Sequence, residues 1–82
     1  MRRYHSEEID PFYFECKQAG SHKFWAAEIV VKKNNYFLVR RYGKIGQEGK
    51  TMVEEFSYMS DAERRKDRLV EEKMAKGYKP VM

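Results

Sequence analysis

Two apolar runs joined by a pair of asparagines occupy residues 24–42, FWAAEIVVKKNNYFLVRRY. In the first run every second side chain is apolar and falls on one face of an extended strand, which favours a half-buried strand. These residues are Trp25, Ala27, Ile29 and Val31. Asn34-Asn35 predicts the turn, because asparagine tolerates the left-handed backbone of tight hairpins. Residues 36–42 then return as an antiparallel strand, and its two partly apolar faces leave open which one joins the core.

Two further strands are predicted on either side of this hairpin. Residues 12–17 alternate between apolar and polar side chains, as expected for a strand with one buried face. Residues 51–58 form the fourth candidate strand. Its apolar residues Met52, Val53 and Phe56 do not alternate cleanly, which suggests a bulge or a bend.

The last third of the chain predicts one amphipathic helix over residues 62–76. Ser60 and Glu63 have the spacing of a capping box, in which each side chain satisfies a free N–H of the first turn. Gly77 predicts the end of the helix. The stripe expected to pack on the sheet is Ala62, Leu69, Val70 and Met74, and the expected outer face is Arg64, Arg65, Lys66, Asp67, Arg68, Glu71, Glu72 and Lys73. The expected fold is therefore α+β, a small antiparallel meander of about four strands with one C-terminal helix.

The length of 82 residues allows one small core and excludes an enzyme built of two lobes around a cleft. Residues 1–11 are expected to form a flexible arm, and residues 12–82 the domain. Cys16 is the single cysteine, so no internal disulfide is possible. No apolar run approaches the roughly 20 residues of a membrane helix, and the N-terminus lacks the apolar core of a signal peptide. We therefore expect a cytoplasmic protein without a membrane partner.

The net charge of +4 is unevenly distributed along the chain. Between Lys23 and Lys50 there are seven basic residues and only two acidic ones, so this segment carries +5 and the remainder −1. Such segregation is typical of an electrostatic footprint for a polyanion. A solvated sheet face explains the same charges, and composition alone does not separate the two interpretations.

A basic, glycine-rich segment follows the third strand at residues 40–51, RRYGKIGQEGKT. Its four cations are candidates for contacts to phosphate oxygens: Arg40, Arg41, Lys44 and Lys50. Tyr42, beside Gly43, is a candidate for stacking on a base or ribose, and its alternative role is that of a core residue at the sheet edge. Gly49-Lys50-Thr51 resembles the end of a nucleotide-binding P-loop, but the spacing from Gly43 is one residue too long and a strand follows where that loop requires a helix.

No catalytic or metal-binding pattern is present in the sequence. His5 and His22 are isolated, whereas a metal site needs three or four converging ligands. Cys16 lies on an apolar strand face, where a thiol is inert. We therefore expect no catalytic residue, no metal, no cofactor and no small-molecule substrate.

The order of these features resembles the WGR domain family. The resemblance rests on Lys23-Phe24-Trp25, on Tyr36 through Gly46, on Gly49-Lys50-Thr51, Phe56, Ala62 and Glu72-Lys73, and on the terminal Gly77-Tyr78, with Phe12 onward as the first strand. It covers about 70 residues and implies an antiparallel sheet with one helix packed on it. The chain would be a solo WGR protein, similar to bacterial ones.

By this resemblance Tyr42 stands where the motif has its tryptophan, which stacks against a DNA end, and Lys44 stands where the motif has arginine. Eukaryotic members lie within DNA-dependent poly(ADP-ribose) polymerases and relay the signal of a strand break to the catalytic part. Tyrosine has a smaller stacking face than tryptophan, and lysine lacks the planar fork of arginine.

These observations lead to two functional hypotheses. The first is a non-enzymatic module that binds DNA weakly and salt-dependently, with little sequence specificity and a preference for ends or single strands. The second is a protein-interaction adaptor without DNA binding, in which Trp25, Tyr36 and Leu38 form an exposed apolar face.

Overall fold

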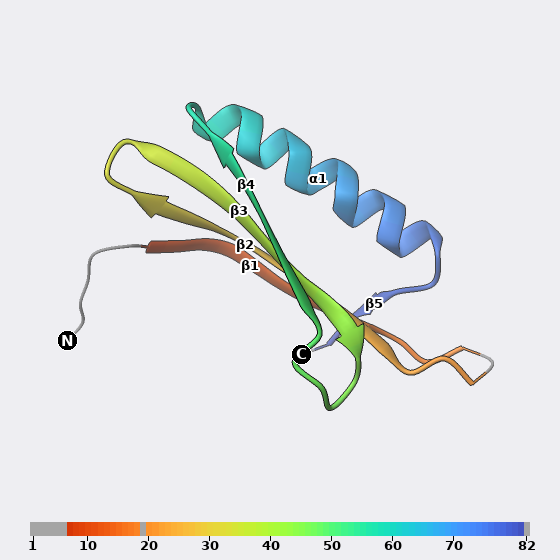
Figure 1. The fold of residues 1–82 in the computed structure, drawn as a ribbon. Coiled ribbons are helices and arrows are strands. Elements are labelled where there is room, and N and C mark those ends of the chain that lie inside the picture. Colours follow the sequence, from red (N-terminus) through yellow and green to blue (C-terminus); the bar gives the residue numbers. More distant parts are fainter. Residues whose placement is uncertain (1–6, 19, 82) are drawn as a thin grey trace.

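The computed structural model describes residues 7–18 and 20–81 as an antiparallel sheet with one helix packed on it (Figure 1). The predicted α+β fold is confirmed. The elements are β1 (Glu7–Cys16), β2 (Lys23–Lys32), β3 (Asn35–Lys44), β4 (Lys50–Phe56), α1 (Met59–Ala75) and β5 (Lys79–Pro80). In the described part of the chain, no helix is long and apolar enough to cross a membrane.

The sheet has five strands in the order β4-β3-β2-β1-β5, one more than the sequence predicted. The first four form the expected meander, and α1 then crosses the sheet so that β5 pairs with β1. The Val81 N–H donates to the Tyr13 carbonyl at 3.1 Å and continues this edge. Two paired residues have no periodicity of their own, so the sequence pattern could not predict β5.

The first strand begins earlier than predicted. Residues 1–6 of the expected arm lie outside the described residues, but residues 7–11 belong to β1, with Glu7 opposite Val31. The register shifts between Ile9 and Phe12. The shifted segment contains a proline, which has no N–H to give to a ladder.

The bulge predicted for residues 51–58 is not formed. Strands β3 and β4 pair in continuous register from Tyr36 opposite Phe56 to Tyr42 opposite Lys50. Met52 and Val53 are 45% and 58% exposed on opposite faces, because β4 is an edge strand and these two positions lie outside the core. The imperfect alternation of apolar residues in β4 is therefore explained by low burial, and the backbone of the strand is regular.

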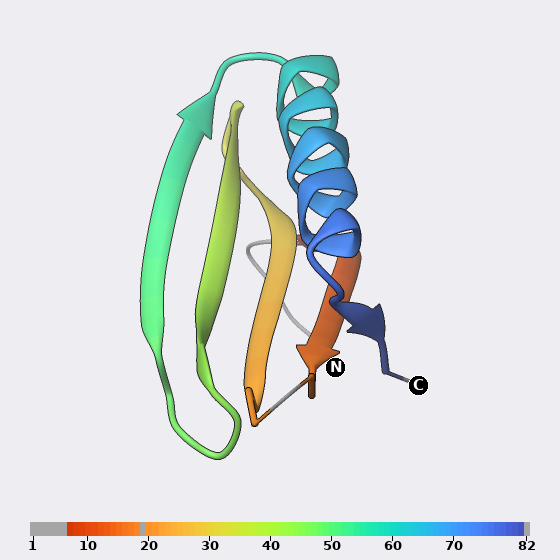
Figure 2. The same ribbon diagram turned by 90° about the vertical axis from the view of Figure 1, so that its right-hand side faces the viewer.

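The hydrophobic core lies between α1 and one face of the sheet, and no helix of residues 7–18 and 20–81 covers the opposite face (Figure 2). Leu38 is fully buried opposite Ile29, so the even-numbered residues of β3 face the helix. This settles the question that the sequence left open. The buried hydrophobic residues of the core cluster are Phe14, Cys16, Trp25, Ala27, Ile29, Leu38, Ala62, Leu69 and Tyr78.

Helix α1 begins at Met59, slightly before its predicted start near Ser60. Tyr58 is the N-cap residue and makes no side-chain capping bond, so the capping box predicted from Ser60 is not formed. Ser60 lies inside the helix and cannot occupy the extended N-cap conformation. The predicted end is confirmed, because Gly77 has φ 100° and its N–H donates to the Met74 carbonyl at 3.1 Å.

The helix buries most of the predicted stripe, because Ala62 and Leu69 lie in the core and Val70 packs partly against it, but two positions differ from the prediction. Lys66, expected on the outer face, is only 1% exposed, and its Nζ lies 4.6 Å from the centroid of the Phe12 ring. Met74, expected in the core, is 53% exposed. The spacing of Ala62, Lys66 and Leu69 is helical, and the lysine stem supplies apolar surface at the middle position.

The turn between β2 and β3 is formed by Lys33-Asn34, one residue before the predicted Asn34-Asn35. Lys33 has φ 57°, and Lys32 pairs with Asn35 at the ends of the two strands. The cross-strand packing of β2 on β3 fixes the register, and it places the left-handed conformation on a lysine despite the preference of asparagine for it.

Candidate nucleic-acid interface

The β3–β4 loop, residues 45–49, lies at the opposite end of β3 from the hairpin turn. Its base is closed by a close approach of two glycines. A Cβ on Gly43 would lie 2.8 Å from the Gly49 Cα, and a Cβ on Gly49, whose φ is 77°, would collide with the Tyr42 carbonyl. Glycine is therefore required where β3 and β4 meet.

Backbone hydrogen bonds hold the loop further along. The Ile45 N–H donates to the His22 carbonyl at 2.9 Å, which joins the loop to the segment preceding β2. The Gln47 N–H donates to the Lys44 carbonyl at 3.0 Å and forms a turn. Gly46 in that turn has φ 93°, and a Cβ added to it would meet no atom within 4 Å. The loop is thus fixed at its base and open at its tip.

Arg41 braces the loop on the face away from the helix. Its guanidinium carbon lies 4.7 Å from the centroid of the Phe24 ring, and its Nη1 donates to the Glu48 carbonyl at 2.7 Å. Tyr13 stacks on the same ring with 5.9 Å between centroids, so Phe24 is buried although the helix does not cover it. Desolvation and then the hydrogen bond to Glu15 raise the pKa of the Tyr13 hydroxyl.

Arg40 lies on the other face of β3, within the protein interior. Its side chain is 14% exposed, and its Nη2 lies 3.4 Å from Oε1 of Glu54. Arg65 of α1 binds the same carboxylate oxygen through Nε at 3.2 Å. Arg40 therefore ties β3 and β4 to the helix, and the alternation of the strand separates it from Arg41.

Tyr42 also lies on the helix side and is partly buried against the core cluster. Its hydroxyl donates to Sδ of Met52 at 3.4 Å. This environment resembles the alternative weighed from the sequence, a residue at the margin of the core, more closely than a free stacking ring.

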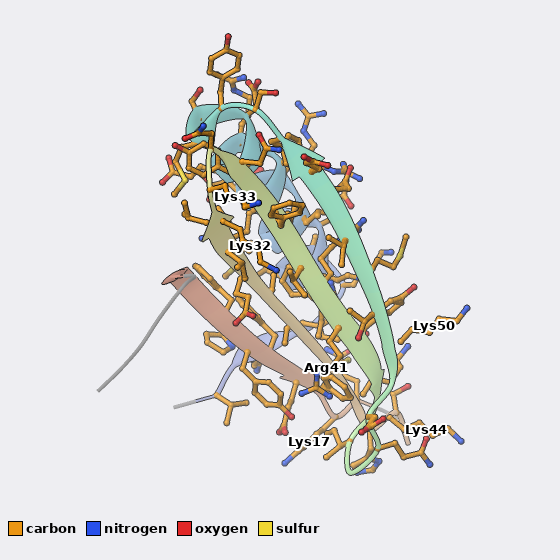
Figure 3. The ribbon with its side chains drawn as sticks, turned by 60° about the vertical axis from the view of Figure 1, so that its left-hand side comes forward. Lys17, Lys32, Lys33, Arg41, Lys44 and Lys50 are labelled. Atoms are coloured by element: carbon orange, nitrogen blue, oxygen red, sulfur yellow. The ribbon has the colours of Figure 1, made fainter. Side chains whose placement is uncertain are left out.

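Lys44 and Lys50 are the exposed cations on either side of the loop. Neither forms an ion pair with any residue that the structure describes. Figure 3 shows them at the loop end together with Arg41 and Lys17, whereas Lys32 and Lys33 lie at the hairpin end. The structure thus gathers Arg41, Lys44 and Lys50 near the loop and directs Arg40 to the interior.

Two elements outside the predicted segment add cations near this end. Lys23 of β2 lies directly opposite Lys44. Lys73 of α1 is half-buried, with its Nζ 5.4 Å from the centroid of the Tyr78 ring. Desolvation, the strongest cause, and then Lys76 lower the pKa of the Lys73 ammonium, with smaller contributions in the same direction from Lys23 and Arg40 and an opposing one from Glu72. The helical pattern placed Lys73 on a solvated face, so no sequence signal joined it to Lys23.

Among the described residues, no group of three or more His, Cys, Asp or Glu side chains is arranged to hold a metal ion. His5 lies outside the described residues. Cys16 is buried, as predicted.

The prediction of an exposed apolar face for a protein partner is wrong. Trp25 and Leu38 belong to the core, and only Tyr36 of that set is partly exposed.

Comparison with known proteins agrees with this architecture. The family model of the WGR domain matches residues 11–82. A crystal structure of a protein from Bacteroides fragilis superposes with a TM-score of 0.70 at 33% sequence identity, and the match covers 88% of this chain and 19% of that one. No curated protein matches. Because the family match spans nearly the whole chain, the protein belongs to the WGR domain family.

Proposed function

We propose that this WGR domain binds DNA with little sequence specificity, through the loop end of its sheet, and favours open ends or single strands. WGR domains are non-catalytic and are generally known as nucleic-acid-binding modules in proteins like the poly(ADP-ribose) polymerases. The observation that carries the proposal is the pair of exposed lysines, Lys44 and Lys50, at the two ends of a loop whose base is closed by the packing of Gly43 on Gly49. Cations without a protein counter-ion are free to replace the counter-ions of a phosphate backbone.

The proposal gives the predicted site residues different roles. Lys44 and Lys50 contact phosphates directly. Arg41 holds the loop through Glu48 and keeps other N–H groups for an incoming oxygen. Gly43 permits the close approach at the base of the loop. Arg40 does not contact DNA and instead stabilises the strands of the site through its ion pair with Glu54.

Tyr42 would contact DNA through the exposed part of its ring. Because Tyr42 packs partly against the core, only part of its side chain is open to a terminal base or ribose. Stacking of a full aromatic face is worth about 1–3 kcal/mol per base, and a partly covered ring should supply the lower end of that range.

The expected affinity is weak and depends on salt. Sequence-independent binding has dissociation constants of roughly 10⁻⁴ to 10⁻⁶ M at physiological salt, and each phosphate contact adds about 0.9 to the logarithmic salt slope on duplex DNA. Raising the salt should therefore release the DNA steeply. A tight complex that is insensitive to salt would contradict the proposal.

The test is fluorescence anisotropy with blunt duplex, 5′-phosphorylated nicked duplex, closed hairpin and single-stranded DNA, each at two salt concentrations. The wild-type protein should bind at low salt and prefer open ends over the closed hairpin. Lys44→Gln/Lys50→Gln should weaken binding to every probe, because phosphate contacts do not depend on the form of the DNA.

Two substitutions at Tyr42 separate stacking from packing. Tyr42→Phe keeps the ring and should keep the preference for open ends, whereas Tyr42→Leu fills much of the same space without a ring and should lose it. If the wild type bound all probes equally, the preference for open ends would be contradicted, and binding would be explained by a basic surface alone. No binding at low salt would reject the proposal and return the question to a protein partner.

A further inference from the structure

We infer that the nucleic-acid backbone does not stop at the loop but continues onto the helix side of the sheet, across Lys23, Lys73 and Lys76. This inference rests on the proposed function and assigns it a second set of phosphate contacts. The ligand is the sugar–phosphate backbone of one strand, recognised by charge.

The strand register supplies the first step. Lys23 and Lys44 are direct partners in the β2–β3 ladder, and Tyr42 pairs with Lys50 in the β3–β4 ladder. Partners across an antiparallel ladder share a face, and Lys23 lies on the same face of β2 as the buried Trp25. The helix-facing register of the sheet therefore carries three lysines at this end, on three adjacent strands.

The course of α1 supplies the second step. The helix runs along the sheet from the hairpin end toward the loop end, as Figure 2 shows, and its last turn carries Lys73. The ring of Tyr78 lies against Lys73, and the Tyr78 N–H donates a hydrogen bond to the Lys73 carbonyl at 3.0 Å. Lys73 is thus positioned by the end of the helix, and Lys76 follows as the exposed C-cap residue.

The electrostatic environment of Lys73 supports the same path. The pKa of Lys73 is lowered by burial and by three neighbouring cations, Lys76, Lys23 and Arg40. Glu72 raises it in opposition. No ion pair to Lys23, Lys73 or Lys76 occurs in the described part of the structure. A bound phosphate would supply the counter-ion that this cluster lacks.

The first experiment compares Lys73→Gln/Lys76→Gln with the wild type in salt titrations on single-stranded DNA and blunt duplex. The matched control is Lys32→Gln/Lys33→Gln, which removes the same charge at the other end of the sheet. We expect the helix pair to weaken binding about five- to tenfold at low salt and to lower the salt slope by roughly one for each lysine. The control should change affinity less than twofold.

The outcomes separate this inference from the proposed function. Loss of binding in Lys44→Gln/Lys50→Gln, with the helix pair equal to the control, would overturn the helix path and leave the loop site intact. If neither pair differs from the control, the loop site and the helix path are both overturned, and any remaining DNA binding belongs to a diffuse basic surface. Thermal unfolding of each variant shows whether the protein is folded during the titration.

A gain of affinity provides a second test that unfolding cannot imitate. Glu72→Gln removes the acid beside Lys73 and should tighten binding about two- to threefold, because a repulsive charge next to the backbone is lost. Asp67→Asn removes the same charge from an exposed position on the same helix and is the control. Equal effects of the two variants would mean that only the net charge matters and would overturn the path.

Discussion

The two ends of β3 carry similar charge but differ in what surrounds it. At the hairpin end, the exposed Lys32 ends β2 and the exposed Lys33 begins the two-residue turn, and the neighbouring Asn35 side chain donates to the carboxylate of Glu55. At the loop end, Lys44 lies opposite another lysine, and the loop is braced by packed glycines and by an arginine on an aromatic ring. A basic residue becomes part of a candidate site through its neighbours in space, which the local sequence does not reveal.

The largest expected effect concerns the packed base of the loop. Gly49→Ala should lower the free energy of unfolding by about 3 kcal/mol, because the Cβ adds a collision with the Tyr42 carbonyl to an unfavourable left-handed backbone. Gly46→Ala has the same backbone cost without a collision and should lose only about 1 kcal/mol. Urea denaturation measures both, and equal losses would show that the base of the loop is not tightly packed.

The next comparison removes two positive charges from one end of the sheet or from the other. Lys44→Gln/Lys50→Gln should weaken DNA binding at low salt about tenfold, or roughly 1.4 kcal/mol, because two phosphate contacts are lost. Lys32→Gln/Lys33→Gln should leave it within twofold. Anisotropy with the same duplex checks both variants, and an equal loss in the two would mean that the whole sheet acts as one diffuse basic surface.

A substitution of Arg41 tests whether its contacts with Phe24 and Glu48 depend on the shape of the guanidinium group. Arg41→Lys keeps the charge but loses the planar group that stacks on Phe24, and should lower the free energy of unfolding by about 1 kcal/mol. Thermal or urea unfolding gives the value. Amide hydrogen exchange at Ile45 and Gln47 should accelerate if the loop loosens, and unchanged exchange would show that Arg41 does not brace it.

The smallest expected effect belongs to the hairpin end and has the opposite sign. Lys33→Gly removes the strain of a left-handed lysine, part of which is offset by the greater freedom of glycine in the unfolded chain. The free energy of unfolding should rise by about 0.5 kcal/mol, with DNA binding unchanged. A loss of stability in urea denaturation would mean that the lysine side chain makes contacts that outweigh the strain.

The amino-acid sequence by itself determined the meander, the helix, the glycine that ends the helix and the position of the basic loop. These features depend on local periodicity and on residue-specific backbone preferences, which act over a few neighbouring positions. The alternation of side chains along β3 also determined that Arg40 and Arg41 lie on opposite faces of the sheet.

Only the tertiary structure decided which face of β3 became the core, and with it the roles of the two arginines. Both faces were apolar enough to be buried, and the choice was made by where α1 packs after β4. The same packing buried Lys66, turned Arg40 inward to Glu54, and brought Lys73 toward Lys23, some 50 residues away in the sequence. Such contacts join distant segments, and local patterns contain no information on them because burial is a property of the assembled surfaces.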